Sequence, residues 1–70
     1  MYKGRPSIMP IVTIQMMEGR TPEQVRSLIS SVTDTIAEQL NAPRERIRVL
    51  VTEIPPTHWG IGGVPASESR

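Results

Sequence analysis

The hydrophobic residues of this chain follow three successive patterns: an alternating stretch, a stretch with helical spacing, and a second alternating stretch. Alternation over residues 10–17 and 46–53 predicts two strands with one apolar face each, because successive side chains of a strand lie on opposite sides. The apolar faces carry Val12, Ile14 and Met16 in the first strand and Ile47, Val49 and Val51 in the second. The opposite face of the second strand carries Arg48, Leu50 and Thr52.

The stretch between the strands predicts one long helix. Thr21 suits the N-cap, Pro22 suits the first helical position, and Gln24 completes a capping box. The helix runs to about Leu40, and Asn41 is a suitable C-cap. Its apolar residues form one stripe, made of Val25, Leu28, Ile29, Val32, Ile36 and Leu40.

A strand, a helix and a second strand in this order predict a right-handed β-α-β unit with parallel strands, an α+β fold. The helix stripe then covers one face of the sheet. The other face carries Ile11, Met17 and Leu50, beside Arg48. A two-stranded sheet with a half-apolar uncovered face is not stable alone, so we expect the subunit to pack against further copies as a homo-oligomer.

The segment after the second strand contains many turn-forming residues. Residues 55–63 include two prolines and three glycines, which predicts a short hairpin. Residues 64–70 show no pattern that would place them in a core. No repeat or linker divides residues 10–70, which we therefore expect to form one domain behind a leader of residues 1–9.

Composition limits the classes of function. The chain has no cysteine and a single histidine, so we expect no metal site. A net charge of +1 speaks against a nucleic-acid partner, and no apolar run has the length of a membrane span. Residues 1–9 lack the apolar stretch of a signal peptide, so we expect a cytoplasmic protein. A ribbon-helix-helix DNA-binding fold would need two helices after one strand, whereas here a strand follows the only long helix.

Four residues could carry chemistry, and each also has a simpler interpretation. Pro10 can merely begin a strand, Arg20 can be a solvated residue, Arg48 can be an interface ion-pair partner, and Trp59 can fill a subunit interface. Arg20 is nevertheless misplaced at a helix N-terminus, because that end of a helix prefers anions. Its position is explained if an anionic ligand lies between Arg20 and the backbone amides of the first helical turn.

Taken together, these residues suit a small anionic substrate. A proline at the chain terminus is a secondary amine, and a free α-amino group titrates at about 7.7–8.0, close to the working pH of a general base. Nearby arginines and partial burial lower the pKa of such an amine, because both disfavour its charged form. The arginines would also bind carboxylates and stabilise charge on a dienolate oxygen.

Several segments resemble the 4-oxalocrotonate tautomerase family, whose members are similar to 2-hydroxymuconate tautomerase. The resemblance covers residues 10–70 and rests on the order and spacing of Pro10-Ile11, Glu18-Gly19-Arg20-Thr21, Gln24, Ala42-Pro43, Ile47-Arg48-Val49 and His58-Trp59-Gly60-Ile61-Gly62-Gly63. It implies a β-α-β subunit assembled as a hexamer. It also implies enol–keto isomerisation of 2-hydroxymuconate-like dienols in aromatic catabolism, by a 1,3- or 1,5-proton shuttle without metal or organic cofactor.

The resemblance also implies roles for single residues. Pro10 matches the family's N-terminal proline base. Arg20 matches the arginine that binds the distal carboxylate, and Arg48 matches the arginine at the 2-oxo end, which a neighbouring subunit contributes. Trp59 falls where many members have a phenylalanine that shields the proline from water.

Met17 and Ile61 match positions that would form an apolar wall of the pocket. In the related trans-3-chloroacrylic acid dehalogenases, one type of subunit has an added arginine and a water-activating glutamate there. Met17 and Ile61 can do neither job, so the resemblance favours tautomerisation over hydrolytic dehalogenation.

The leader departs from the family, whose members begin at the proline. Two explanations stay open. In the first explanation, translation begins at Met9, whose removal would free the Pro10 amine, and the leader is foreign to the natural protein. Alternatively, the leader is native and the protein is a non-catalytic or weakly active relative, because an acylated proline has no basic nitrogen. Removal of Met1 would not free Pro10 in that case.

Overall fold

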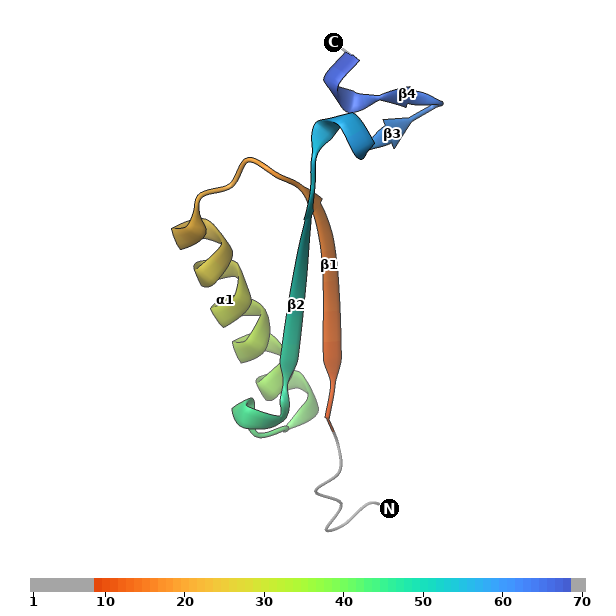
Figure 1. The fold of residues 1–70 in the computed structure, drawn as a ribbon. Coiled ribbons are helices and arrows are strands. Elements are labelled where there is room, and N and C mark those ends of the chain that lie inside the picture. The colour runs from red at the N-terminus through yellow and green to blue at the C-terminus, as the bar shows by residue number, and fades with distance from the viewer. Residues whose placement is uncertain (1–8, 69–70) are drawn as a thin grey trace.

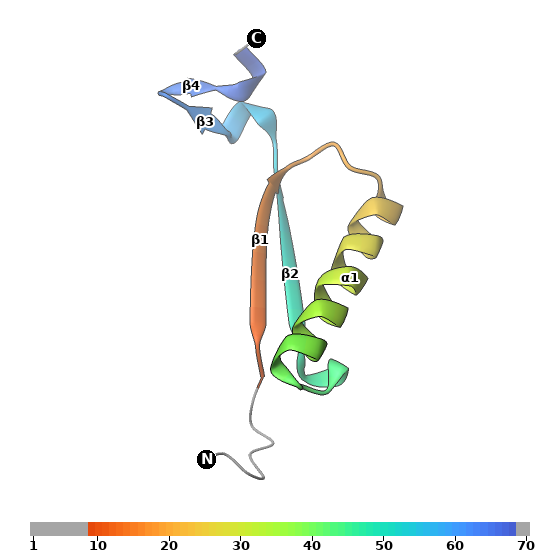
Figure 2. The ribbon, with the colours of Figure 1, turned by 180° about the vertical axis from the view of Figure 1, so that it is seen from behind.

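The computed structural model describes residues 9–68, and they form one β-α-β unit followed by a small hairpin (Figure 1). Strand β1 (Ile11–Met17) and strand β2 (Arg48–Ile54) pair in parallel, from Ile11 opposite Arg48 to Met17 opposite Ile54. Helix α1 (Pro22–Leu40) connects the two strands in the sequence. It runs in the opposite direction to them and covers one face of the sheet, as the view from behind also shows (Figure 2). The predicted order, the parallel pairing and the α+β class are confirmed.

Both ends of α1 form as the sequence predicts. The Gln24 N–H donates to the Thr21 hydroxyl at 3.1 Å, and the Thr21 N–H donates to the Gln24 side-chain oxygen at 2.9 Å. These two bonds make the capping box and satisfy donors that the first helical turn leaves unpaired. Asn41 closes the helix in the left-handed region with φ of 53°, a conformation that asparagine adopts more readily than most residues.

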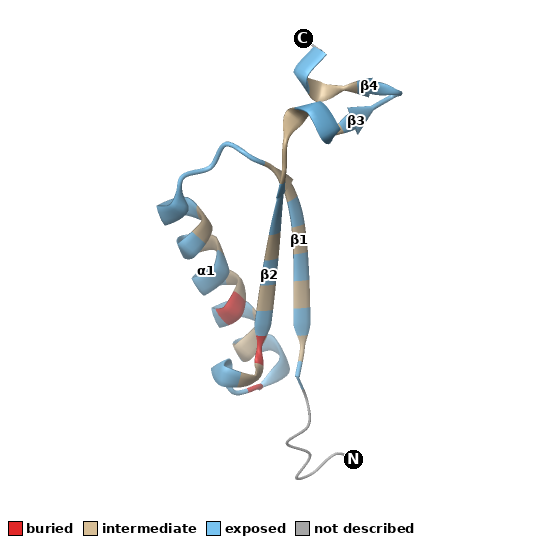
Figure 3. Cartoon of the chain, in the orientation of Figure 1, coloured by how far each residue is buried: buried red, intermediate tan, exposed pale blue. Residues whose placement is uncertain are grey.

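The core between helix and sheet is small. Only Thr33, Ala42 and Ile47 are buried among the described residues, and none of these residues has a fully buried side chain (Figure 3). Thr33 was missed as a core residue because its hydroxyl is polar. That hydroxyl donates to the Ile29 carbonyl at 2.7 Å, so its burial leaves no hydrogen-bonding group unsatisfied.

Two members of the predicted apolar stripe lie at its margin. Leu40 is 54% exposed and Ile29 is 36% exposed, so neither is buried in the core of the subunit. Leu40 is the last residue of α1, where the chain already turns toward β2, and Ile29 lies at the edge of a surface groove. The sequence prediction therefore placed two residues too many on the helix face that packs against the two-stranded sheet.

The second face of the sheet is uncovered, as predicted. Along both strands exposed and partly buried residues alternate, which Figure 3 shows as bands on β1 and β2. Ile11 is 63% exposed and Leu50 is 51% exposed on this face. Burying a leucine or isoleucine side chain is worth about 1.5–3 kcal/mol, so the subunit leaves a stabilising contribution unused unless another surface covers this face.

The hairpin extends further than predicted. Strand β3 (Gly60–Ile61) pairs with strand β4 (Val64–Pro65), and a 3₁₀ turn, Ala66–Glu68, follows. Gly62 and Gly63 form the tight turn with φ of 61° and 92°, the positive values of a type I′ turn. Residues 64–68 were predicted to lie outside the core, and none of them is buried. Their place in the hairpin was not predicted, because two-residue strands give no readable alternation.

One local bond closes this hairpin onto itself. The Ala66 N–H donates to the Trp59 carbonyl at 2.7 Å, and the hairpin extends from the end of β2 beyond the sheet (Figure 1). Its apolar residues Ile61 and Val64 are 54% and 42% exposed. In residues 9–68, no helix is both long and apolar enough to span a bilayer.

The uncovered sheet face yields a first prediction. Replacing Leu50 with Asp should abolish stable assembly, because a carboxylate would be buried unpaired wherever another subunit covers this face. Sedimentation velocity at micromolar concentration should show a large assembled species for the wild type and a smaller or unfolded one for the variant. Ser31→Asp, on the exposed side of α1, should sediment like the wild type. A stable folded monomer in the wild type would contradict the predicted oligomer.

Candidate active site

Pro10 and Arg48 lie next to each other at the start of the two parallel strands. Pro10 is half-buried directly before β1, and its carbonyl accepts a hydrogen bond from the Arg48 N–H at 3.0 Å. This bond is the first link between the two strands and fixes the distance between the two backbones. The structure therefore brings the predicted base and one predicted arginine to the same end of the sheet.

The Arg48 side chain is exposed, yet its orientation is defined. Its Nη1 donates to the Glu45 carbonyl at 2.8 Å and, more weakly, to the Ile47 carbonyl at 3.5 Å. Nη1 is thereby occupied by the chain's own backbone. The Nε and Nη2 edge makes no hydrogen bond to residues 9–68, and this edge can bind a carboxylate through two parallel bonds.

Arg20 lies at the opposite end of the sheet, in the loop between β1 and the first turn of α1. It borders a groove of about 490 Å³, which is lined by Arg20, Pro22, Val25, Arg26, Ile29 and Glu53. Within the described residues, no hydrogen bond or ion pair occupies the side chains of Arg20 and Arg26. Two guanidinium groups, one carboxylate and the N-terminus of a helix together give this groove a net attraction for anions.

Sequence reasoning did not identify Arg26 and Glu53 as residues of the groove. A signal for Arg26 was present, since Arg26 follows Pro22 by four positions and so lies on the same face of the helix. Glu53 is the residue of β2 opposite Met16, on the face that α1 covers. Its position near Arg20 follows from the tertiary pairing of strand and helix, which the local sequence does not specify.

The three remaining candidates lie at the same end of the sheet as Arg20 and the groove. Met17 is the last residue of β1 and is half-buried, while Trp59 and Ile61 belong to the segment beyond β2. Trp59 is half-buried and Ile61 is exposed. Met17 thus lies at the carboxyl end of β1, and Trp59 and Ile61 lie beyond the carboxyl end of β2, whereas Pro10 precedes β1.

One subunit therefore does not bring all six candidates together. Pro10 and Arg48 form a base end, while Met17, Arg20, Trp59 and Ile61 form a hairpin end. A seven-residue strand separates the two ends, and at 3.3 Å per residue it spans about 20 Å. This is much longer than a six-carbon substrate, so a site that uses both ends has to draw them from different subunits.

Comparison with known proteins decides the family. The model of a family described as tautomerase enzymes matches residues 10–68, nearly the whole described chain, and the match begins at Pro10.

The chain belongs to the tautomerase family.

As a tautomerase it is an isomerase by reaction class. It is 53% identical over 62 residues to the 2-hydroxymuconate tautomerase of Pseudomonas sp. strain CF600, a match that covers 89% of this chain and 98% of that protein.

Solved structures of the family share the fold. TomN, a 4-oxalocrotonate tautomerase homologue in the tomaymycin biosynthetic pathway, superposes with a TM-score of 0.81 at 37% identity, over 84% of this chain and 91% of that one. A heterohexameric 4-oxalocrotonate tautomerase from Chloroflexus aurantiacus superposes with a TM-score of 0.79 at 33% identity, over 90% of this chain and all of that one. The resemblance noted in the sequence is thus confirmed for family and fold.

No group of three or more histidine, cysteine, aspartate or glutamate side chains within residues 9–68 could hold a metal ion. Among the predicted site residues, Arg48 brings a guanidinium to the base end and Arg20 brings one to the hairpin end. These arginines can bind carboxylates and stabilise negative charge on oxygen.

The capping box yields a second prediction. Replacing Thr21 with Ala removes the side-chain acceptor beside Arg20 and should lower the free energy of unfolding by about 1 kcal/mol. Chemical denaturation monitored by circular dichroism measures this loss. Thr35→Ala is the matched control, because the Thr35 hydroxyl bonds only the Ser31 carbonyl on an exposed part of the same helix. Equal loss in both variants would mean that the cap contributes nothing beyond an ordinary threonine.

Proposed function

We propose that this tautomerase interconverts the enol and keto forms of 2-hydroxymuconate-like dienol dicarboxylates in the cytoplasm, with Pro10 as its base. The observation that carries the proposal is the position of Pro10, which is the first residue matched by the family model and is bonded to Arg48 through its carbonyl. The 53% identity to the 2-hydroxymuconate tautomerase of Pseudomonas sp. strain CF600 supports the choice of substrate class.

The proposed reaction needs one base and two cations. The neutral amine of Pro10, free only at a chain terminus, takes the proton of the 2-hydroxyl group. The same amine then returns that proton to carbon 3 or carbon 5, so the substrate is isomerised with no gain or loss of atoms. Arg48 stabilises the charge that develops on the 2-oxygen, and Arg20 binds the distal carboxylate.

The site is proposed to form between subunits of a homo-oligomer, which we infer to be a hexamer. Three observations support this assembly. The base end and the hairpin end lie about 20 Å apart in one subunit. The sheet leaves Ile11 and Leu50 uncovered, and the Chloroflexus aurantiacus relative is itself a heterohexamer. In such an assembly, Trp59, Met17 and Ile61 of one subunit would form the apolar wall around another subunit's proline.

The chemistry of proline also defines the alternative function. Any residue attached ahead of Pro10 converts its nitrogen into an amide, which has essentially no basicity. A chain that keeps such residues would retain the scaffold and both arginines, and it would act as a weakly active or non-catalytic oligomer. The two functions differ only in the covalent state of one nitrogen atom.

This difference gives the third prediction. A form that begins at Pro10 should tautomerise 2-hydroxymuconate about a hundredfold or more faster than the 70-residue form, which is the usual contribution of a general base. Ultraviolet absorbance follows the reaction, and intact mass establishes the first residue of each form. Sedimentation should show the same assembly for both, as a control. Equal turnover by the two forms would eliminate Pro10 as the base.

The arginines give the fourth prediction. Arg48→Ala should mainly lower kcat, because charge on the 2-oxygen develops during the reaction. Arg20→Ala should raise KM as well as lower kcat. Each loss should amount to about 1.5–3 kcal/mol of transition-state stabilisation, or about ten- to a hundredfold. Steady-state kinetics on the form that begins at Pro10 measures both constants, and unchanged constants in both variants would remove these residues from the site.

A further inference from the structure

The orientation of Arg48 depends on a short turn that precedes it. This 3₁₀ turn, Arg44–Arg46, is held by two backbone bonds: the Arg46 N–H donates to the Pro43 carbonyl and the Ile47 N–H donates to the Arg44 carbonyl, both at 3.0 Å. The Glu45 carbonyl lies within this turn and accepts from Arg48 Nη1 at 2.8 Å. The position of the turn therefore sets where the Arg48 guanidinium lies.

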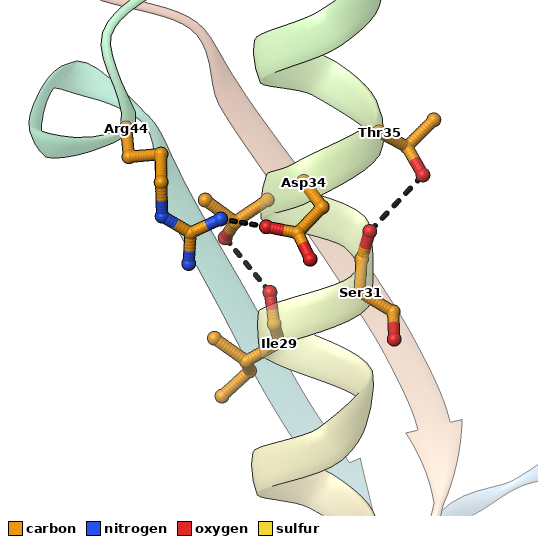
Figure 4. A network of polar contacts seen from close by, with 6 residues as sticks. Ile29, Ser31, Asp34, Thr35 and Arg44 are labelled. Atoms are coloured by element: carbon orange, nitrogen blue, oxygen red, sulfur yellow. Dashed lines mark hydrogen bonds and ion pairs between the residues drawn. The ribbon is translucent and has the colours of Figure 1, made fainter.

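A side-chain contact ties the same turn to the helix. Arg44 forms an ion pair with Asp34, which projects from the fourth turn of α1 (Figure 4). Both side chains are more than half exposed. An exposed pair of this kind contributes little to global stability, so its loss should leave the fold intact. It can still restrict the motion of this three-residue turn relative to the helix.

We propose that Asp34 and Arg44 are positioning residues for the tautomerase reaction. Their ion pair holds the Arg44–Arg46 turn against α1, and the turn's Glu45 carbonyl in turn fixes Nη1 of Arg48. The guanidinium is left with its Nε and Nη2 edge free for two oxygen atoms at the 2-oxo end of the substrate. This inference rests on the proposed role of Arg48 in binding the substrate.

The geometry distinguishes this role from direct binding. Neither Asp34 nor Arg44 needs to touch the substrate, because each acts through the backbone of the turn. Their loss should therefore affect kcat in the same manner as a partial loss of Arg48 and should leave KM nearly unchanged. A small displacement of a guanidinium that stabilises developing charge reduces the rate without abolishing it.

The test is a double-mutant cycle in the form of the protein that begins at Pro10, with 2-hydroxymuconate as the substrate. Asp34→Asn and Arg44→Gln should each lower kcat about two- to fivefold, the range expected for an exposed ion pair. In the Arg48→Ala background, Asp34→Asn should have no further effect, because the group that it positions is gone. The exchanged pair Asp34→Arg with Arg44→Asp should recover most of the lost rate.

Glu38→Gln is the matched control. It removes one carboxylate from the same helix, one turn beyond Asp34. Glu38 makes no ion pair or side-chain hydrogen bond within residues 9–68, so its replacement should leave kcat unchanged. Circular dichroism and sedimentation establish that every variant remains folded and assembled.

Each outcome bears on a separate claim. If Asp34→Asn leaves kcat unchanged, or lowers it equally with and without Arg48, the pair does not act through Arg48 and the inference is overturned. If Arg48→Ala alone leaves kcat unchanged, the proposed role of Arg48 fails and this inference fails with it. A loss that the Glu38→Gln control reproduces would point to the net charge of the helix instead.

Discussion

The hydrogen bond between the Arg48 N–H and the Pro10 carbonyl begins the pairing of the two strands, and the rest of the subunit depends on that pairing. It sets the register in which Ile11 lies opposite Arg48, and through this register it sets which side chains of β1 and β2 face the helix. A shift by one residue would transfer every apolar side chain of a strand to the opposite face. The same bond holds Pro10 and Arg48 at one end of the sheet, so the strand pairing also positions two of the proposed site residues.

The subunit's small core follows from this two-stranded arrangement. A helix on one face of two strands buries little side-chain surface, and only three of the described residues are buried. Local hydrogen bonds define the two ends of the helix in place of a large core. The capping box at Thr21 fixes where α1 begins, and the left-handed conformation of Asn41 fixes where it ends. The proposed contacts between subunits would then add stability as well as complete the site.

The sequence predicted those features that local chemistry determines. Strand alternation, the cap at Thr21 and the end of the helix at Asn41 each depend on a few adjacent residues, and all three are confirmed. The burial of Thr33 depends on packing between helix and sheet and was missed. The extent of the hairpin was missed because its two-residue strands are too short to show alternation. For the site, residue types and the family resemblance indicated the candidates. The division into two ends, and the position of Glu53 in the groove, required the three-dimensional arrangement, whereas the spacing of Arg26 from Pro22 already indicated that they share a helix face.

The separation of the base end from the hairpin end has a consequence for how such proteins can diverge. If one copy of the chain supplies the base and another supplies the surrounding wall, a duplicated gene can lose one half of the site in each copy while a mixed assembly remains active. Selection would then act on the pair of genes rather than on either product. A small subunit whose proposed site uses one proline and two arginines thus provides a direct route from a symmetric enzyme to an obligate partnership of two different chains.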